Sequence, residues 1–175
     1  MSEQQQFWFA ARTRKDQEIA VRNSLKKIGM EHYIPTQIVV RQLKYRKKEI
    51  EIPVIRNLVF VYATKEKACS LVNDYGIRLF YVKNVETGGL LVVPDKQMND
   101  FMLVMNIDPT GVSFDNELLE VGEKVQVVKG EFAGVEGELV RIANRSYVVI
   151  RIPQVFFASV RIPKSYLKKI RSKAY

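Results

Sequence analysis

The sequence predicts two folded parts in series: an α+β domain with an antiparallel sheet flanked by helices, then a small all-β barrel. Helix and strand patterns alternate up to about residue 106, whereas only short strand patterns follow. A turn signal at Asp108-Pro109-Thr110-Gly111 separates them. We therefore expect an N-terminal domain over residues 1–106, a linker over 107–118 and a five-stranded barrel with a basic tail over 119–175.

The first part begins with an apolar run at 7–12, which predicts a central strand. Residues 15–29 predict a helix, because Val21, Leu25 and Ile28 fall on one helical face. Its last residue is a glycine, which favours a helix end there. The further expected elements are a strand pair over 32–43 and 44–55, a buried strand over 57–63, a helix over 65–74, a strand over 79–86 and a helix over 94–105.

The second part shows no helical periodicity, and its short alternating segments have the spacing of a small barrel. Gly130, Gly134 and Gly137 surround a strand-to-strand turn with Phe132 at its tip. Because glycine takes positive φ without steric cost, we expect all three to serve turns or a bulge. A plain tight hairpin is the alternative that the glycines alone leave open. The expected strands are 123–128, 137–142, 146–152, 157–162 and 166–170.

The composition favours an anionic partner. The 175 residues include 28 Lys and Arg against 19 Asp and Glu, so the net charge is +9. Nucleic acid and an anionic membrane surface both fit this surplus, as does a role in solubility alone. No apolar run of about 18 residues predicts a membrane span, and the start lacks the order of a secretory signal. With a single cysteine, the chain fits the reducing cytoplasm.

Chemistry-bearing motifs are scarce in the sequence. One cysteine, Cys69, and one histidine, His32, cannot assemble a zinc cluster. We expect Cys69 to be a buried small hydrophobe and His32 to be structural. No P-loop, dinucleotide fingerprint or nucleophile elbow is present. We therefore expect no enzymatic activity, no cofactor and no metal.

Residues 121–140, VGEKVQVVKGEFAGVEGELV, resemble the KOW motif, whose glycines and apolar positions they match. Residues 7–37 resemble the opening of the NusG N-terminal domain, and residues 84–102 resemble its glycine pair, Val-Pro and closing helix. The resemblance extends from Phe7 to Ile170 and identifies a NusG-like transcription elongation or antitermination factor of bacterial type. It implies an SH3-like KOW barrel in the second part, which we expect to be β-structured at rest.

One departure from the family pattern lies on the central strand. The family usually carries an aromatic residue, proline, glycine or asparagine, and tyrosine there, whereas this chain reads Ile55-Arg56-Asn57-Leu58. The departure favours a specialised paralogue of the UpxY-like or RfaH-like kind over a housekeeping copy.

The resemblance implies that the N-terminal domain binds RNA polymerase through an exposed apolar patch and suppresses pausing or termination. Large apolar residues are usually buried, so a core role is the alternative for most of the matching positions. We expect Leu58 to be exposed, because it replaces the family's contact tyrosine. The candidate polymerase-binding residues are Ile55, Leu58, Phe60, Val93, Met98 and Phe101.

Basic residues in two places are candidates for contact with DNA near the transcription bubble. One group lies in the expected hairpin, where Tyr45 could stack on a base. Lysines that only prevent edge pairing are the alternative there. The other group precedes the first helix, where the resemblance places non-template-strand contacts. The candidate residues are Arg41, Lys44, Tyr45, Arg46, Lys47 and Lys48, together with Arg12, Arg14 and Lys15.

Aromatic residues of the barrel are candidates for a second protein partner. Phe132 lies at the expected turn, and either Phe156 or Phe157 must face outward if both lie on one strand. The resemblance implies that this partner is a small-subunit ribosomal protein or Rho. We expect the protein to be a monomer with no membrane contact. A KOW-containing ribosome-associated or RNA-binding module is the alternative function.

Overall fold

The structure is a computed structural model that describes residues 5–115, 122–152 and 154–170. It divides into two compact units, Met1–Asp95 (unit 1) and Lys96–Tyr175 (unit 2). Helix α3 (Asp95–Ile107) therefore groups with the strands that follow it, although its sequence pattern continues that of the first part.

Unit 1 is built on an antiparallel sheet with the strand order β2-β5-β1-β6. The central pair is β1 and β5, in which Phe9 lies opposite Val61 and Ala11 opposite Val59. Strand β7 also pairs with β1. The bounds are β1 Phe7–Arg12, β2 His32–Tyr33, β5 Leu58–Ala63, β6 Phe80–Tyr81 and β7 Val92–Val93.

The strand expected over 79–86 is wrong in its length, since only Phe80 and Tyr81 form β6. The chain turns soon after this strand. The side chain of Asn84 accepts hydrogen bonds from the backbone N–H groups of Glu86 and Thr87, at 2.8 and 3.2 Å. An asparagine that bonds its own following backbone closes a turn, and this ends the extended segment.

Helices α1 (Glu18–Lys27) and α2 (Lys65–Asn73) pack against one face of the sheet. Alternate strand residues share this face, because side chains on a strand point to opposite sides in turn. Burying each large apolar side chain contributes roughly 1.5–3 kcal/mol, so this core stabilises unit 1. The buried residues that α1, α2 and the two central strands contribute to it are Val21, Leu25, Ala68, Leu71, Phe9, Ala11, Val59, Val61 and Ala63.

The helix ends follow the local sequence. Gly29 has a φ of +68° just beyond α1, as expected for a helix stop. The Thr64 hydroxyl accepts a hydrogen bond from the Lys67 N–H at 3.2 Å and caps α2. On α1, the buried Glu18 accepts a hydrogen bond from the Asn57 N–H at 2.6 Å. This bond joins the start of the helix to the loop before β5.

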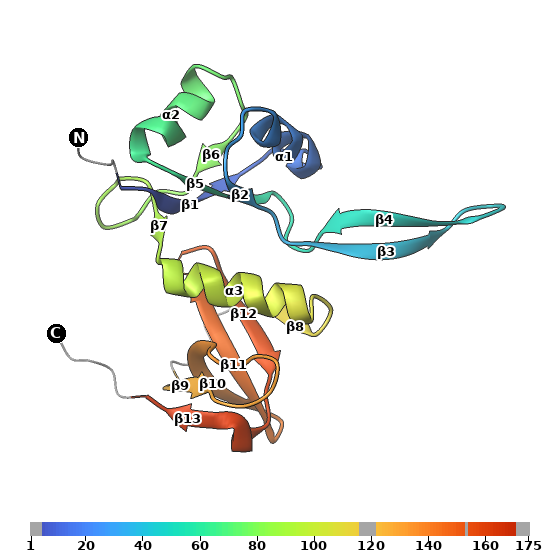
Figure 1. Ribbon diagram of the computed structural model, residues 1–175, viewed down its shortest axis with the longest axis vertical. Coiled ribbons are helices and arrows are strands. Elements are labelled where there is room, and N and C mark those ends of the chain that lie inside the picture. Colours follow the sequence, from blue (N-terminus) through green and yellow to red (C-terminus); the bar gives the residue numbers. More distant parts are fainter. Residues whose placement is uncertain (1–4, 116–121, 153, 171–175) are drawn as a thin grey trace. The chain divides into compact units, whose positions relative to one another are not determined.

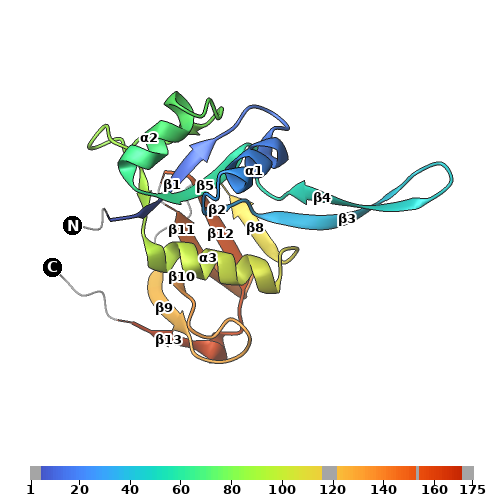
Figure 2. The ribbon, with the colours of Figure 1, turned by 45° about the horizontal axis from the view of Figure 1, so that its top comes forward.

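Strands β3 (Thr36–Gln42) and β4 (Lys47–Pro53) form a two-stranded hairpin that pairs with no other described strand. The hairpin projects from the rest of unit 1 in both ribbon views (Figures 1 and 2), and we call it the arm. Its register runs from Thr36 opposite Pro53 to Gln42 opposite Lys47. The strand pair expected from the sequence is therefore confirmed.

Unit 2 contains a six-stranded antiparallel sheet with the order β13-β9-β10-β11-β12-β8. The five strands expected from the sequence are confirmed. Strand β8 was not expected, because it lies inside the range 107–118 that the sequence predicts as a linker; residues 116–118 of that range lie outside the described residues. The bounds are β8 Val112–Asp115, β9 Glu123–Val127, β10 Glu136–Ile142, β11 Arg145–Ile152, β12 Phe156–Arg161 and β13 Leu167–Lys169.

The three glycines around the expected turn have different structural roles. Gly130 and Gly134 have φ values of +82° and +96°, where glycine is favoured. Gly137 has no positive φ; a Cβ at this position would lie 2.5 Å from the carbonyl oxygen of Val149 on the neighbouring strand. Of the expected turn or bulge, the turn is wrong for Gly137, which lies inside β10 and whose missing side chain lets two strands approach closely.

Cys69 is exposed on α2, so the expectation of a buried cysteine is wrong. Its helix neighbour Ala68 is fully buried and takes the core position instead. The end of the expected basic tail, residues 171–175, lies outside the described residues.

Candidate functional site

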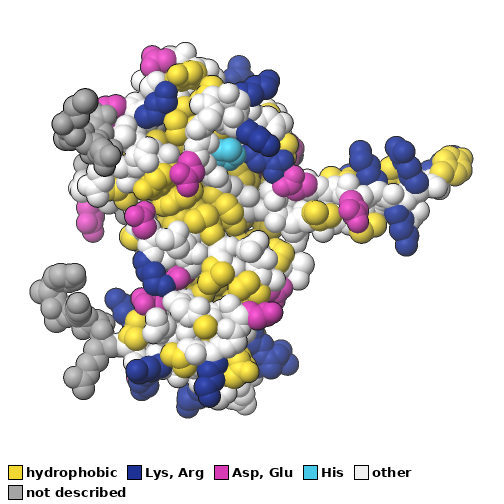
Figure 3. All heavy atoms as spheres, viewed as in Figure 1, with side chains coloured by type: hydrophobic (Ala, Val, Ile, Leu, Met, Phe, Trp, Pro, Cys, Tyr) yellow, Lys and Arg dark blue, Asp and Glu magenta, His cyan; other side chains and the backbone are white. Residues whose placement is uncertain are grey.

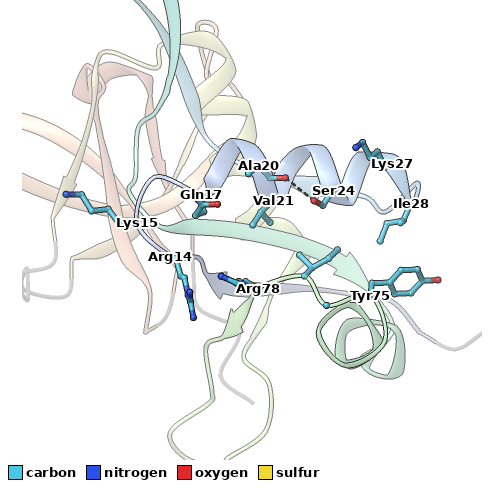
Figure 4. Close-up of a pocket in the computed structure, with 12 residues that line it drawn as sticks. Arg14, Lys15, Gln17, Ala20, Val21, Ser24, Lys27, Ile28, Tyr75 and Arg78 are labelled. Atoms are coloured by element: carbon cyan, nitrogen blue, oxygen red, sulfur yellow. Dashed lines mark hydrogen bonds between the residues drawn. The ribbon is translucent and has the colours of Figure 1, made fainter.

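A basic groove with a volume of about 680 Å³ runs beside α1 in unit 1 (Figure 4). The segment before α1, the helix itself and the segment after α2 line it. No Asp or Glu lies among the described residues of this lining. The groove therefore carries a positive potential that attracts anions. Its four cationic side chains are Arg14, Lys15, Lys27 and Arg78.

The floor of the groove is apolar, and an aromatic ring stands at one end. Val21 and Ile77 are buried, and Ile28 is half-buried. Half of the Tyr75 surface is exposed. The Lys67 ammonium lies 4.7 Å from the centre of the Tyr75 ring and donates a hydrogen bond to its hydroxyl at 3.2 Å. These two contacts hold the ring in place.

Cations beside an apolar floor and a ring match the two chemical parts of a single-stranded nucleic acid. Its phosphates pair with Lys and Arg, and its bases stack on aromatic faces. The N-terminus of α1 adds a partial positive charge at the same place. Of the basic residues predicted before this helix, Arg14 and Lys15 line the groove. Arg12 is half-buried at the end of β1 and lies outside the lining.

The arm gathers the other predicted basic residues. In the space-filling view, Lys and Arg side chains occupy its outer part, with a hydrophobic side chain at the tip (Figure 3). Tyr45 is 87% exposed, so its ring is free to contact a partner. The Lys44 ammonium lies 5.3 Å from the centre of this ring. Lys and Arg side chains at such exposed positions suit contact with phosphates. The exposed basic residues of the arm are Arg41, Lys44, Arg46, Lys47 and Lys48.

The base of the arm is tied to α1 by a charged pair. Arg22 donates two hydrogen bonds to the Glu51 carboxylate, at 2.5 and 2.8 Å, and the Thr36 hydroxyl donates a third at 2.7 Å. Hydrogen bonds from Arg22 and then from Thr36 stabilise the ionised carboxylate and lower the pKa of Glu51 to about 2. The same pair raises the pKa of Arg22 above its ordinary value. The bidentate geometry fixes the direction in which the arm leaves the unit.

The apolar residues predicted to contact polymerase are largely buried. Leu58 and Phe60 have no exposed surface, and Val93 is 1% exposed. The expectation that Leu58 is exposed is therefore wrong; it begins the central strand β5, whose residues from Leu58 through Val61 have no exposed surface. Ile55, in the loop before β5, is half-buried and is the most accessible of the four predicted contact positions in unit 1.

On α3, both predicted polymerase contacts are buried, and one of them packs on the sheet of unit 2. Met98 and Phe101 have no exposed surface. The Phe101 ring lies 6.2 Å from that of Phe114 on β8 and 5.0 Å from that of Phe156 on β12, measured between ring centres. Aromatic rings at these separations and tilts attract one another beyond the effect of burial. Of the two predicted contact residues of α3, Phe101 is thus part of a packed aromatic cluster.

A polar link also joins α3 to the sheet of unit 2. The buried Asp100 carboxylate accepts hydrogen bonds from Lys96 at 2.7 Å and from the Glu136 N–H at 3.0 Å. Lys96 also donates to the Gly134 carbonyl at 2.8 Å. These bonds fix α3 beside the turn that the glycines form. No sequence signal marks Asp100, because its partner at Glu136 is a backbone group.

The aromatic candidates of the sheet differ in exposure. Phe156 is buried, whereas Phe132 and Phe157 are half-buried. Phe157 is thus the more outward of the adjacent pair, as strand alternation predicts. The Arg151 guanidinium lies 4.5 Å from the centre of the Phe157 ring, directly across the strand pair, and forms an ion pair with Glu138 at 2.7 Å. A partner of Phe157 would therefore also meet a charged pair.

Two expected absences concern metal and membrane. Across the described ranges, no group of three or more His, Cys, Asp or Glu side chains could hold a metal ion. Nor does any helix in those ranges have the length and apolar character needed to cross a bilayer. His32 is half-buried, and its Nδ1 donates to the Met30 carbonyl at 2.7 Å, which is a structural role.

Three groove residues were missed by the sequence reasoning, namely Lys27, Tyr75 and Arg78. Lys27 lies in the last turn of α1, where a basic side chain also suits the helix dipole. Tyr75 and Arg78 lie in a short segment without periodicity, and only the fold brings them beside α1.

The family model described as "Transcription termination factor nusG" matches residues 6–102. No curated protein matches the chain. Among solved structures, the chain is 19% identical to Thermotoga maritima NusG, from a study of its domain interaction, over 95% of this chain and 98% of that one, with a TM-score of 0.47. It is 16% identical to a chain of the MjSpt4:Spt5 complex in conformation B, over 94% of this chain and 97% of that one, with a TM-score of 0.27.

Proposed function

Because the chain belongs to the NusG family of transcription factors, we propose that it is an elongation and antitermination factor that binds RNA polymerase and suppresses pausing or termination. The family match carries this proposal, since it spans more than half of the chain and nearly all of unit 1. Polymerase binding falls to the N-terminal part, residues 1–106, and partner recruitment to a KOW barrel in residues 119–175, with 107–118 between them. The protein acts as a monomer in the cytoplasm.

A specialised role follows from the loop before β5. Asn57 has a φ of +59°, a conformation that asparagine and glycine tolerate better than other residues. The chain thus keeps the residue type that the turn needs, while Leu58 replaces the family's tyrosine in the strand. A changed residue at the start of β5, beside a turn residue of the family's type, fits a paralogue of the UpxY-like or RfaH-like kind.

DNA near the transcription bubble is the second partner. The basic groove supports this, because it joins cations, an apolar floor and the Tyr75 ring in one concave site. We assign single-stranded DNA to this groove, with Arg14, Lys15 and Arg78 on phosphates. The concave shape suits a flexible strand whose bases are unstacked.

Polymerase contact through α3 requires that helix to separate from the sheet of unit 2. Met98 and Phe101 have no exposed surface while Phe101 packs on Phe114 and Phe156. The polar link at Asp100 must open at the same time. The polymerase-binding form is therefore a rearranged state. Ile55, which is only half-buried, needs less rearrangement than Met98 or Phe101 to contact polymerase.

The sheet of unit 2 recruits a small-subunit ribosomal protein or Rho. Phe132 and Phe157 support this, because each leaves part of an aromatic side chain accessible. Aromatic and arginine side chains are enriched in protein interfaces, and Arg151 adjoins Phe157.

Gel filtration of the full chain with purified bacterial RNA polymerase tests the proposal. The wild type should co-elute, and Ile55→Asp should not. Ile142→Asp, which puts the same charge at a residue 44% exposed on β10, is the matched control and should co-elute. Pause lifetimes in a single-round transcription assay should shorten with the wild type. A full chain that neither co-elutes nor alters pausing would overturn the proposal.

A further inference from the structure

The charges of the arm are arranged on both of its faces. Arg41 lies directly opposite Lys48 in the hairpin register, and Gln42 lies opposite Lys47. Since neighbouring side chains on a strand point to opposite faces, Arg41 and Lys48 share one face and Lys47 lies on the other. Two more cations, Lys44 and Arg46, occupy the turn. The outer arm thus presents cations on every side.

This arrangement is unfavourable in the free protein. Like charges directly opposite each other in a strand pair repel, and no Asp or Glu lies between residues 41 and 48 to offset them. The nearest acid, Glu49, lies on the face of Lys47, away from the pair formed by Arg41 and Lys48. An anionic partner that reaches both faces would relieve the repulsion.

The shape of the arm distinguishes it from the groove. The groove is concave and has an apolar floor, whereas the arm is a narrow projection whose outer side chains are all exposed. A single strand offers one line of phosphates, which can lie along one face. A duplex offers two phosphate strands on either side of a groove. The B-form major groove, about 12 Å wide, admits a two-stranded β-ribbon whose strands lie about 4.8 Å apart.

The arm is also preorganised at both ends. At the tip, the Leu43 N–H donates to the Arg46 carbonyl at 2.8 Å, and the Gln42 amide donates to the Leu43 carbonyl at 2.9 Å. At the base, Glu51 is held by Arg22 and Thr36. A ribbon fixed at its base and closed at its tip loses little conformational freedom on binding.

We propose that the arm binds duplex DNA by entering the major groove, with Arg41 and Lys48 facing one phosphate strand and Lys47 facing the other. The contacts are to the backbone, so recognition depends on charge and groove shape and not on base sequence. This inference rests on the proposed function, in which DNA lies near the protein, and adds that the duplex beside the bubble is a separate ligand from the single strand in the groove.

Fluorescence anisotropy of the full chain with a labelled 20-base-pair duplex, and with one of its strands alone, tests the inference across a salt series. Each lost phosphate contact lowers the slope of log affinity against log salt by about 0.9 for duplex DNA. Arg41→Gln/Lys48→Gln should therefore lower the duplex slope by about 2, and Lys47→Gln by about 1. Neither variant should change the affinity for the single strand.

Lys65→Gln/Lys83→Gln, which removes two exposed cations of unit 1 outside arm and groove, is the matched control and should leave the duplex slope unchanged. Protection of guanine N7 from dimethyl sulfate then reports the groove, because N7 faces the major groove. The wild type should protect it, and the Arg41/Lys48 variant should not.

Three results would overturn the inference: no duplex binding by the wild type, equal losses in the control and arm variants, or losses confined to the single strand. Co-elution of the arm variants with RNA polymerase separates this inference from the proposed function. If the variants still co-elute but bind duplex as tightly as the wild type, the arm assignment fails alone. If no form co-elutes but the arm variants lose duplex binding, the proposed function fails and the arm assignment stands.

Discussion

Replacing Asp100 with alanine should loosen α3 from the sheet of unit 2 without unfolding the sheet. The carboxylate is 7% exposed and accepts from the Glu136 N–H, so its removal leaves a partly buried backbone donor without that acceptor. A hydrogen bond to a charged group contributes about 1.5–3 kcal/mol. The ion pair adds less than about 1 kcal/mol, because Lys96 is half exposed.

We therefore expect Asp100→Ala to cost about 2–3 kcal/mol, which corresponds to a roughly 30- to 150-fold faster exchange of the Glu136 amide hydrogen. Hydrogen exchange followed by NMR measures this amide directly, and urea unfolding gives the global change. Asp100→Asn keeps an acceptor oxygen and should lose only about 1 kcal/mol.

Asp95→Asn is the matched control, because it removes an exposed carboxylate from the first turn of the same helix. It should cost only about 0.3–1 kcal/mol through the helix dipole and leave the Glu136 amide unaffected. Unchanged exchange at Glu136 in Asp100→Ala, or equal effects of Asp95→Asn and Asp100→Ala, would show that the link does not hold the helix.

Further outcomes follow from the glycines, the core and the base of the arm. Gly137→Ala should lower the free energy of unfolding by about 1–3 kcal/mol or more, because the new Cβ meets backbone atoms. Gly134→Ala should lower it by about 1–2 kcal/mol through the positive φ alone. A larger loss in Gly134→Ala than in Gly137→Ala, measured by urea unfolding, would contradict this. Leu58→Ala should lower stability by about 2–5 kcal/mol, whereas a loss below about 0.5 kcal/mol would mean an exposed residue. Arg22→Ala should raise the pKa of Glu51 from about 2 toward its ordinary 4.5, measured by NMR titration of its carboxyl carbon. Since that pKa is lowered in the folded state, the pair stabilises the wild type above about pH 4.5 and loses its effect as pH falls to about 2. If the difference in the free energy of unfolding between wild type and Arg22→Ala did not change between about pH 4.5 and about pH 2, this reasoning would be refuted.

Periodic segments were predictable from the sequence. The two unit 1 helices, the central strands and the five strands of unit 2 each carry an apolar pattern of the matching period. Strand β8 was not predictable, because Val112–Asp115 is too short to show an alternating pattern. Its place in the sheet comes from pairing with β12. Helix α3 was predicted correctly, but its packing partner was not, since an apolar face does not identify what covers it.

The candidate site was predictable only where charge was dense in the sequence. The run from Arg41 to Lys48 is visible as five cations in eight residues. The groove is not visible, because Arg78 and Lys27 lie far apart in the chain and only the approach of the segment after α2 to α1 joins them. The expected exposure of Leu58 was wrong because the central strand β5 is buried from its first residue, Leu58, through Val61.

The exposed thiol of Cys69 gives the chain a built-in attachment point. Because it is the one cysteine in the sequence, a maleimide dye or spin label would react at a single known position on α2 without any engineered background. The same accessibility allows two chains to couple through a disulfide in an oxidising buffer, so mass measurements need a reductant or Cys69→Ser. A label on α2 lies in unit 1, and a second cysteine introduced on α3 would let the separation of these two helices be followed by energy transfer as polymerase is added.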